Sequence, residues 1–327
     1  MTQEEELARL VQKAEEGDVQ AQCMLADMYA LGLAGEEEEK VVYWNKKAAE
    51  QGYATAQANL ADCYTIGLGV EMDLEQAVYW NQKAAEQGNT HAQLNLGYSY
   101  EYGEGGLERD MQKAVYFYTQ AAENGNNTAR FNLGNCYING EGVERNYLVA
   151  VYWYSISAME GYADSQYSLA RCYEHGYGVN QDMRKAVEFY TAAAEQGQTK
   201  AQFMLGCIYM EGKGVEKNEI KAVEWHTKAA EQGELGSQLA LISYYGDDVE
   251  NVDTKREELL KWMTKASEQG DATAQHALGL YYETGLGKVD EINEEKAIFW
   301  YTKAAGQGHE KSMKKLEELN GNTVTKE

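Results

Sequence analysis

The sequence predicts an all-α protein, a right-handed α-solenoid of about eight helix-turn-helix repeats of about 36 residues, with a helical cap at each end. Three observations predict this class. Glycines recur at a nearly constant interval, no proline occurs in the 327 residues, and apolar residues recur every four positions between the glycines. A fixed period of this length is typical of a repeat array, in which each unit packs against its neighbours.

Nine glycines mark the repeat boundaries. Their successive spacings are 35, 36, 37, 36, 36, 36, 37 and 38 residues, and most of them follow a Glu-Gln pair. They are Gly17, Gly52, Gly88, Gly125, Gly161, Gly197, Gly233, Gly270 and Gly308. Because a solenoid grows by adding repeats, the length of the chain reflects the number of repeats and not the number of separate domains. Residues 1–320 are therefore expected to form a single domain.

The first helix of each repeat follows its glycine. It carries a small residue at the fourth position after the glycine, Leu at the eighth and Tyr at the twelfth, and this spacing places all three on one face. We expect that face to be packed. A turn such as Gly67-Leu68-Gly69-Val70 follows, and its first glycine suits the left-handed conformation that ends many helices.

The second helix of each repeat carries an aromatic residue eight positions before the next glycine. These residues are Trp44, Trp80, Phe117, Trp153, Phe189, Trp225, Trp262 and Trp300. Stacking on a ligand would be the functional interpretation of such a stripe. Identical placement in every repeat instead favours packing between repeats, so the stripe is predicted to be core.

The two ends of the chain are expected to act as caps. Residues 1–17 are predicted to form an N-terminal cap helix and residues 309–320 a C-terminal one, whose polar faces shield the ends of the stack. Residues 321–327 are expected to be a disordered tail. The seventh repeat departs from the pattern, because Gly246-Asp247-Asp248-Val249 replaces its double-glycine turn.

Charge restricts the class of partner. The chain has 53 acidic and 29 basic side chains and a formal net charge of −24. Nucleic acid and anionic membrane surfaces require a positive footprint, so a protein with a basic surface is the expected partner. The acidic start, Met1 to Glu6, does not resemble a secretion signal, and no stretch approaches eighteen apolar residues. We therefore expect a cytoplasmic protein without membrane insertion.

Cysteine and histidine usage predicts neither disulfides nor a metal. No repeat contains two of the five cysteines, and equivalent positions on stacked helices lie too far apart to be bridged, so they are expected to be reduced packing residues. The five histidines form no His-Glu-x-x-His pattern and there is no Cys-x-x-Cys pair. The Gly-x-Gly turns follow helices and not strands, so no dinucleotide or other cofactor is expected.

Several motifs carry a resemblance to a known family. Ala-Arg-Phe-Asn-Leu-Gly at residues 129–134, Tyr137, Gly-Glu-Gly-Val at 140–143 and Lys-Ala-Ala-Glu-Gln-Gly at 83–88 resemble the Sel-one-like repeat, a relative of the tetratricopeptide repeat. The resemblance covers residues 1–320. It implies a family of adaptor and scaffold proteins that bind other proteins, without choosing among their partners.

Positions that vary between repeats indicate a candidate binding surface. By analogy with tetratricopeptide geometry, a concave groove is lined by the first helices, and its middle repeats carry aromatic residues and an arginine, which are typical of binding hot spots. The candidate partner-binding residues are Tyr98, Tyr102, Phe131, Asn135, Tyr167, Arg171, His175 and Phe203. We expect an extended segment of a partner here, with Arg171 pairing an acidic group. Asn59, Asn95 and Asn132 are further candidates as donors to a peptide backbone. Alternatively, Phe131, Tyr167 and Phe203 only touch the neighbouring first helix.

The chain is predicted to be non-enzymatic and to be a monomer or weak oligomer. A dedicated inhibitor, such as an immunity protein that neutralises a basic toxin, is a second function that the acidity would suit. A third is binding or hydrolysis of β-lactams, because Ser312-Met313-Lys314-Lys315 fits the form Ser-x-x-Lys. Neither Ser-Asp-Asn nor Lys-Thr-Gly accompanies it, so chance is the favoured explanation.

Overall fold

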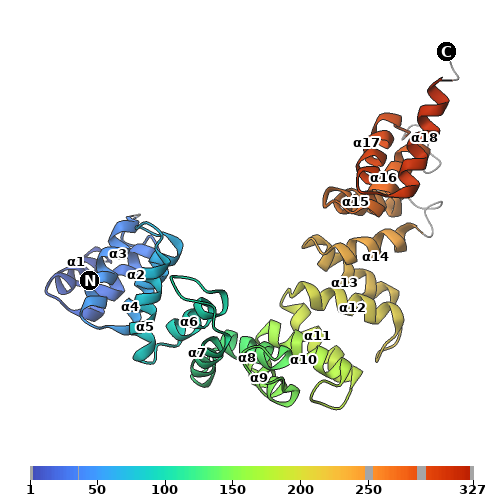
Figure 1. Ribbon diagram of the computed structural model, residues 1–327. Helices are drawn as coiled ribbons and strands as arrows, with labels where there is room; N and C mark the ends of the chain where they lie inside the picture. The colour runs from blue at the N-terminus through green and yellow to red at the C-terminus, as the bar shows by residue number, and fades with distance from the viewer. Residues whose placement is uncertain (1–2, 36, 247–252, 286–291, 325–327) are drawn as a thin grey trace. The chain divides into compact units, whose positions relative to one another are not determined.

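The computed structural model describes residues 3–35, 37–246, 253–285 and 292–324 (Figure 1). These residues form eighteen α-helices and no strand. They divide into two compact units, Met1–Gln181 and Asp182–Glu327, which are described separately. The first unit contains α1 (Gln3–Glu15), α2 (Val19–Ala30), α3 (Glu38–Glu50), α4 (Ala54–Ile66), α5 (Leu74–Glu86), α6 (Thr90–Tyr102), α7 (Met111–Glu123), α8 (Asn127–Asn139), α9 (Tyr147–Met159) and α10 (Ala163–His175).

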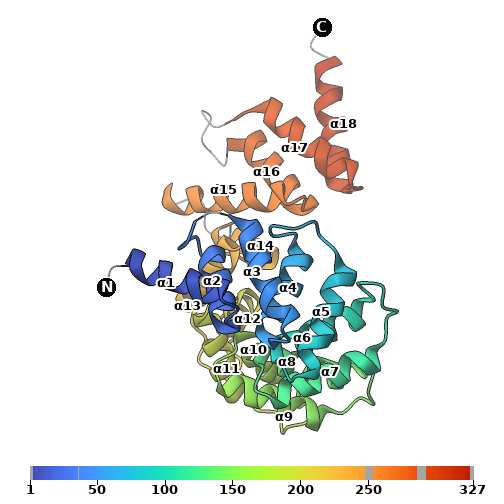
Figure 2. The ribbon, with the colours of Figure 1, turned by 90° about the vertical axis from the view of Figure 1, so that its left-hand side faces the viewer.

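The second unit contains α11 (Met183–Glu195), α12 (Thr199–Glu211), α13 (Glu219–Glu231), α14 (Leu235–Gly246), α15 (Asp253–Glu268), α16 (Ala272–Thr284), α17 (Glu294–Gly306) and α18 (Glu310–Val324). Within each unit every helix packs on the next one along the chain. Figure 2 shows this succession of helix pairs for α15 to α18. The predicted all-α solenoid is confirmed.

Side-chain caps set where the second helices begin. Asp73 has extended backbone and its carboxylate accepts hydrogen bonds from the backbone N–H groups of Glu75 and Gln76, at 3.1 and 3.0 Å. Such a cap satisfies N–H groups that have no partner within the helix. The same role in five further second helices is taken by Asp110, Asn146, Asp182, Asn218 and Asn293, whereas Glu37 before α3 makes no such bond.

The two glycines of each turn have different roles. Gly67 ends α4 in the left-handed conformation, with φ of 73°, as the sequence predicts. Gly69 also has positive φ, 65°, and in addition a Cβ atom there would collide with the backbone of Glu38 and Glu39. The second glycine is therefore required because the turn lies directly against the start of the preceding second helix.

In seven of the eight repeats a buried glutamine of the first helix bonds to the end of the helix before it, and together these bonds form a glutamine ladder. Gln57 donates from Nε2 to the carbonyl oxygen of Ala49, at 3.2 Å, and accepts at Oε1 from Nε2 of Gln87, at 2.8 Å. Gln87 comes directly before the boundary glycine Gly88. The Glu-Gln-Gly signature therefore contributes more than a turn, because its glutamine bonds to the first-helix glutamine of the same repeat, which in turn bonds to the end of the previous repeat. The other first-helix glutamines that donate to the same backbone position are Gln22, Gln93, Gln166, Gln202, Gln238 and Gln275.

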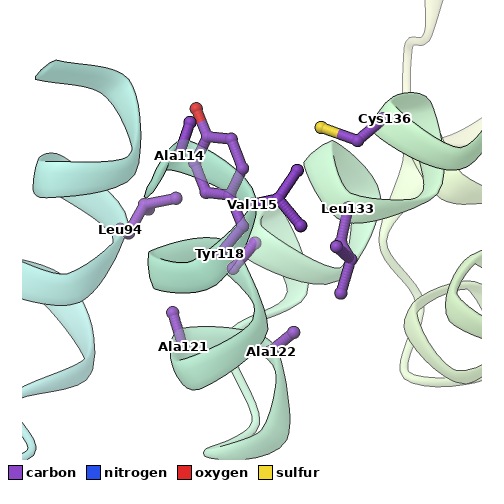
Figure 3. Packing of buried hydrophobic residues seen from close by; sticks show 9 residues of the cluster. Leu94, Ala114, Val115, Tyr118, Ala121, Ala122, Leu133 and Cys136 are labelled. Atoms are coloured by element: carbon purple, nitrogen blue, oxygen red, sulfur yellow. The ribbon is translucent and has the colours of Figure 1, made fainter. Parts of the chain in front are cut away.

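The predicted aromatic core is confirmed for Trp44, Trp80 and Trp262, which are buried. The other five aromatic residues of that stripe are half-buried, so for them the prediction is only partly right. The next residue along the helix lies deeper in the middle repeats and in the eighth. Figure 3 shows one such residue, Tyr118 of α7, with its ring beside Leu94. The aromatic stripe predicted from the sequence therefore lies at the edge of the core. In these repeats the centre of the core is occupied by the residue that follows the stripe residue in the sequence.

Both expected caps are helical. α1 lies within the predicted range 1–17, whereas α18 continues to Val324 and so ends four residues later than the predicted boundary at residue 320. Gly321 and Asn322 are weak helix formers but do not stop a helix as proline does. The rest of the predicted tail, residues 325–327, lies outside the described residues. So does the altered turn of the seventh repeat after Gly246.

Candidate functional site

Tyr98 and Tyr102 lie one turn apart on α6 and form a stacked pair. Their ring centroids are 6.5 Å apart and the planes differ by 19°. Tyr98 is half-buried, with its ring edge-on to Tyr118 at 5.7 Å, whereas Tyr102 is 63% exposed. The exposed ring therefore stacks on the partly buried one and presents an aromatic surface to solvent.

Phe131 and Asn135 on α8 are both engaged within the first unit. The ring of Phe131 lies 6.1 Å from Tyr154 and 5.9 Å from Tyr162, between the following helices. Asn135 accepts a hydrogen bond at Oδ1 from the hydroxyl of Tyr154, at 2.6 Å. Because Tyr162 is the N-cap of α10, the geometry for Phe131 favours the alternative that this position touches the neighbouring first helix.

Tyr167, Arg171 and His175 follow one another at intervals of four along α10. Tyr167 is half-buried, and burial raises the pKa of its hydroxyl. Arg171 is exposed and forms no ion pair in the described part of the chain. His175 is exposed as well, and its ring lies 5.3 Å from the ring of Tyr177. The sequence-predicted residues on α10 therefore combine one packed ring with two accessible polar groups.

Phe203 belongs to the second unit and is a packing residue there. Its ring lies 5.8 Å from His226, and a Cβ added to Gly236 on α14 would come within 2.9 Å of it. His226 is buried, accepts or donates at Nδ1 with Ser237 at 3.1 Å, and has its pKa lowered by burial. The other seven candidates lie on α6, α8 and α10 of the first unit.

Two of the three candidate amide donors are already used within the protein. Nδ2 of Asn95 donates to Oδ1 of Asp62 at 3.1 Å, and Nδ2 of Asn59 donates in the same way to Asp27 at 3.2 Å. Nε2 of His91 lies 2.8 Å from Oδ2 of Asp62, which raises the pKa of the imidazole. These contacts form a polar network along α2, α4 and α6 that sequence reasoning missed.

A small cavity of about 160 Å³ lies beside this network, between α4, α5 and α6. Asp62, Asn81, Tyr98 and Glu104 contribute polar groups to its lining. Asn81 was not among the predicted residues. The repeat alignment holds a signal for it, because the equivalent residues of repeats three to five are all tyrosines.

A larger cavity of about 540 Å³ lies in the second unit. Side chains of α12, α13 and α14 line it, together with Lys255 of α15. They include Cys207, the half-buried cysteine, whereas the other four cysteines are buried and all five are free. Burial raises the pKa of the Cys63 thiol to about 11 and that of Cys136 to about 12. Their expected role as packing residues fits these positions.

Ser312 of the Ser-x-x-Lys pattern is fully buried. Its hydroxyl lies 2.9 Å from Nδ1 of His276 and 3.0 Å from Nδ1 of His309, while Nζ of Lys315 bonds to Glu283 at 2.9 Å. The serine and the lysine thus bond to different side chains and not to each other. The geometry therefore gives no support to the alternative that the protein binds or hydrolyses β-lactams.

The described helices include none long and apolar enough to cross a membrane. Within the described ranges, no three His, Cys, Asp or Glu side chains are grouped so that they could hold a metal ion.

Paired helices that stack in chain order define a helical-repeat protein. The Sel1 repeat matches residues 19–53, 54–89, 90–126, 128–162, 163–198, 199–234, 237–271 and 272–309. The chain belongs to the Sel1 repeat family, whose members generally bind other proteins and generally lack enzymatic activity. The eight repeats and the resemblance predicted from the sequence are confirmed.

Solved structures include relatives of similar architecture. A protective antigen of uropathogenic Escherichia coli with an SLR fold is 37% identical, with 95% of this chain and 73% of that chain covered and a TM-score of 0.54. A Sel1 repeat protein from Oxalobacter formigenes is 31% identical, with 97% and 80% covered and a TM-score of 0.56. An immunity protein from Pseudomonas aeruginosa is 23% identical, with 65% and 81% covered, and its TM-score of 0.41 carries no argument about function. No curated protein matches the sequence.

Proposed function

We propose that this protein is a non-enzymatic scaffold that binds a partner protein along the first helices α6, α8 and α10, the surface that tetratricopeptide geometry makes a groove. One observation carries the proposal. Arg171 is an exposed cation without an ion pair in the described residues, although the chain has 24 more negative than positive side chains. An arginine that stays unpaired among so many carboxylates is available to an acidic group of a partner.

The aromatic residues support the same surface. Tyr102 offers a large exposed ring stacked on Tyr98, and a tyrosine has few rotatable bonds, so little conformational entropy is lost when a partner packs on it. Elsewhere the excess of carboxylates favours a partner whose surrounding surface is basic and speeds the encounter with it.

Affinity capture with a pair of exposed variants tests the proposal. Tyr102→Ala combined with Arg171→Glu should abolish capture of the partner without changing helical content, because neither side chain is buried. The matched control combines Tyr116→Ala, a tyrosine 59% exposed on the second helix α7, with Lys46→Glu on α3. Retention by the first variant, or equal loss in both, contradicts the proposal.

A dedicated inhibitor of a basic toxin is the second candidate, supported by the net charge of −24. Expression of the captured partner alone distinguishes the two functions. An inhibitor requires that the partner arrests growth and that co-expression of this chain restores it, whereas a scaffold partner is harmless alone.

A further inference from the structure

The cavity of about 540 Å³ in the second unit lies between the sixth and seventh repeats and has the size of a ligand site. Cavities that hold ligands in proteins measure about 300–1,000 Å³. Met210 of α12, with Ala240 and Tyr244 of α14, gives this one apolar walls. The cavity belongs to the second unit, whereas the candidate surface on α6, α8 and α10 belongs to the first.

Short side chains open this cavity. At the position of His226 the third and fourth repeats have Tyr118 and Tyr154, and at the position of Ser243 the third repeat has Tyr98. Two further positions hold asparagine in the fourth repeat and a smaller residue here, Cys207 and Ala240. The cavity is therefore a property of this pair of repeats, and the repeat fold does not require it.

His226 lines the cavity with a ring nitrogen that has no partner. The residue is 3% exposed, and its Nδ1 lies 3.1 Å from the hydroxyl oxygen of Ser237. Nε2 forms no hydrogen bond within the described part of the chain. Among the described residues, the unpartnered polar atoms that are sealed from solvent belong to Asn45, Asn81, Asn132 and Ser267. Nε2 of His226 is therefore unpartnered but can be reached from the cavity.

The equivalent tyrosines show where the outer edge of this ring points. The hydroxyl of Tyr118 donates to the carboxylate of Glu101, and the hydroxyl of Tyr154 donates to Oδ1 of Asn135. In the sixth repeat the two acceptor positions are occupied by residues that line the cavity, Met210 and Cys207. The sixth repeat thus lacks both the hydroxyl and its acceptor, and the edge of the imidazole faces the cavity instead.

The polar groups of the lining determine which ligand fits. Burial lowers the pKa of His226, so the imidazole is neutral at neutral pH, and Nε2 donates or accepts according to the tautomer. A hydroxyl group can serve either tautomer. The carboxylates of the lining are already paired, Glu211 with Lys213 and Glu219 with Lys217. The lining therefore favours a neutral hydroxyl over a cation or an anion.

The apolar walls favour an aromatic ring. Met210 carries a thioether, which contacts rings favourably, and Tyr244 supplies a second ring for an aromatic pair. Tyrosine is the side chain that joins a ring to a hydroxyl, whereas the N–H of tryptophan only donates and so serves one tautomer. Ring and hydroxyl together match both parts of the lining.

We infer that the cavity lined by Met210, His226 and Tyr244 binds a tyrosine side chain of a partner protein, with its hydroxyl bonded to Nε2 of His226. The inference rests on the proposed function in taking this tyrosine from a partner protein, and it adds a second site. The ligand supplies the hydroxyl that Tyr118 and Tyr154 supply within their own repeats.

Two small probes test the site independently of any partner. N-acetyl-tyrosine amide reproduces a tyrosine within a peptide, and N-acetyl-phenylalanine amide lacks only the hydroxyl. In protein labelled with ¹³C at its methionine methyl groups, the tyrosine probe should shift the signal of Met210 in a saturable manner and leave that of Met24 on α2 unchanged. The phenylalanine probe should bind roughly two- to tenfold more weakly, because one hydrogen bond is lost.

Three results with these probes overturn the inference. They are equal affinities of the two probes, the absence of a saturable shift at Met210, and tighter binding of free tyrosine than of its amide. The last result would show that the site takes a free amino acid and not a residue of a protein.

A matched pair of histidine variants identifies the determinant. His226→Phe keeps a ring opposite Gly206 but removes Nε2, so the two probes should bind with equal affinity. His276→Phe makes the same change at a histidine that also bonds to a serine, Ser312, but does not line the cavity. It should keep the preference for the tyrosine probe. Loss of the preference in both variants, or retention in both, contradicts the assignment.

A variant at the rim leaves the buried ring untouched. Ser243 is exposed, and Ser243→Tyr introduces the residue that the third repeat has there, Tyr98, which lines a cavity of only about 160 Å³. The variant should therefore fold and lose saturable binding of the tyrosine probe. In the parent protein, saturating probe should slow alkylation of Cys207, which lines the same cavity. Unchanged affinity in the variant, or alkylation at the same rate with and without probe, contradicts the inference.

The outcomes separate this inference from the proposed function. If the tyrosine probe fails to bind while Tyr102→Ala with Arg171→Glu still abolishes partner capture, the tyrosine contact is wrong and the scaffold function stands. If the probe binds with the expected preference and partner capture does not depend on those two residues, the tyrosine site stands and the proposed surface on α6, α8 and α10 is wrong.

Discussion

Gly134 on α8 and Tyr154 on α9 pack so closely that any side chain at residue 134 would overlap the tyrosine ring. The same relationship joins three other pairs of helices within a repeat. These are Gly97 with Tyr118, Gly206 with His226, and Gly279 with Tyr301. Each of these glycines therefore exists to admit a ring between the two helices of its repeat.

Gly134→Ala is expected to destabilise the protein. Alanine favours a helix over glycine by about 1 kcal/mol, but overpacking against a buried ring costs about 1–3 kcal/mol. We expect a net loss of up to about 2 kcal/mol in the free energy of unfolding, measured by urea denaturation. The control is Gly306→Ala, where the added methyl meets no atom within 4 Å and should not destabilise.

A second substitution tests the cause of that loss. Gly134→Ala with Tyr154→Asn reproduces the pair Ala61 and Asn81 of the second repeat. The two changes should be less destabilising together than the sum of the single effects, because the ring that clashes is absent. Additive effects would show that the glycine is needed for another reason.

The glutamine ladder predicts that Gln57→Ala is costly although it removes only a polar side chain. The carbonyl oxygen of Ala49 and Nε2 of Gln87 would both lose a partner, the former in a buried position. We expect a loss of about 1–3 kcal/mol in the free energy of unfolding. Gln112→Ala, on the exposed face of α7, is the control and should change it by less than about 0.5 kcal/mol.

The second unit is expected to lose stability on acidification. Burial lowers the pKa of His226 and of His276 below the ordinary value of about 6.5. As the pH falls below 6.5 the unfolded chain gains protons that the folded chain does not, so stability present at neutral pH is lost. His91 in the first unit behaves oppositely, because Asp62 raises its pKa.

Thermal melts between pH 7.5 and 5.0 measure this loss. His226→Tyr restores the ring found in repeats three to five, keeps Gly206 opposite, and should make the melting temperature less sensitive to pH. A variant with the same sensitivity as the parent would exclude His226 as a cause.

Cysteine alkylation should be selective in the native state. Cys207 is half-buried and lines the larger cavity, whereas the other four cysteines are buried. Burial raises the pKa of every one of the five thiols, so reaction with iodoacetamide should be slow at neutral pH. Peptide mapping should find Cys207 modified first, and all five should react together in urea. Faster modification of Cys136 would contradict the described burial.

Much of the fold could be predicted because the same cap residues, turn glycines and apolar positions recur in most repeats. The helix boundaries follow from cap residues such as Asp73 and turn glycines such as Gly67, whose effects act within a few residues. The tryptophan stripe was also visible as a period. The deeper position of Tyr118 was not, because periodicity shows which residues recur and not which of two adjacent residues faces the neighbouring helix.

The candidate surface was predictable only in part. Tyr102 and Arg171 lie exposed on first helices, as the repeat offsets predict. Phe131, Asn135 and Phe203 instead contact neighbouring side chains, because the same offset can face solvent or an adjacent helix depending on the length of the residue opposite. Partner binding at this surface stays a prediction that the capture experiment tests.

The sequence by itself determined the number of repeats, the all-α class and the acidic character, because period, turn residues and charge are local or additive properties. Only the tertiary structure decided that Asn81 leaves a cavity with an unpaired oxygen where Tyr118 fills one. That difference depends on which atoms meet across three helices, and no spacing along a single chain records it.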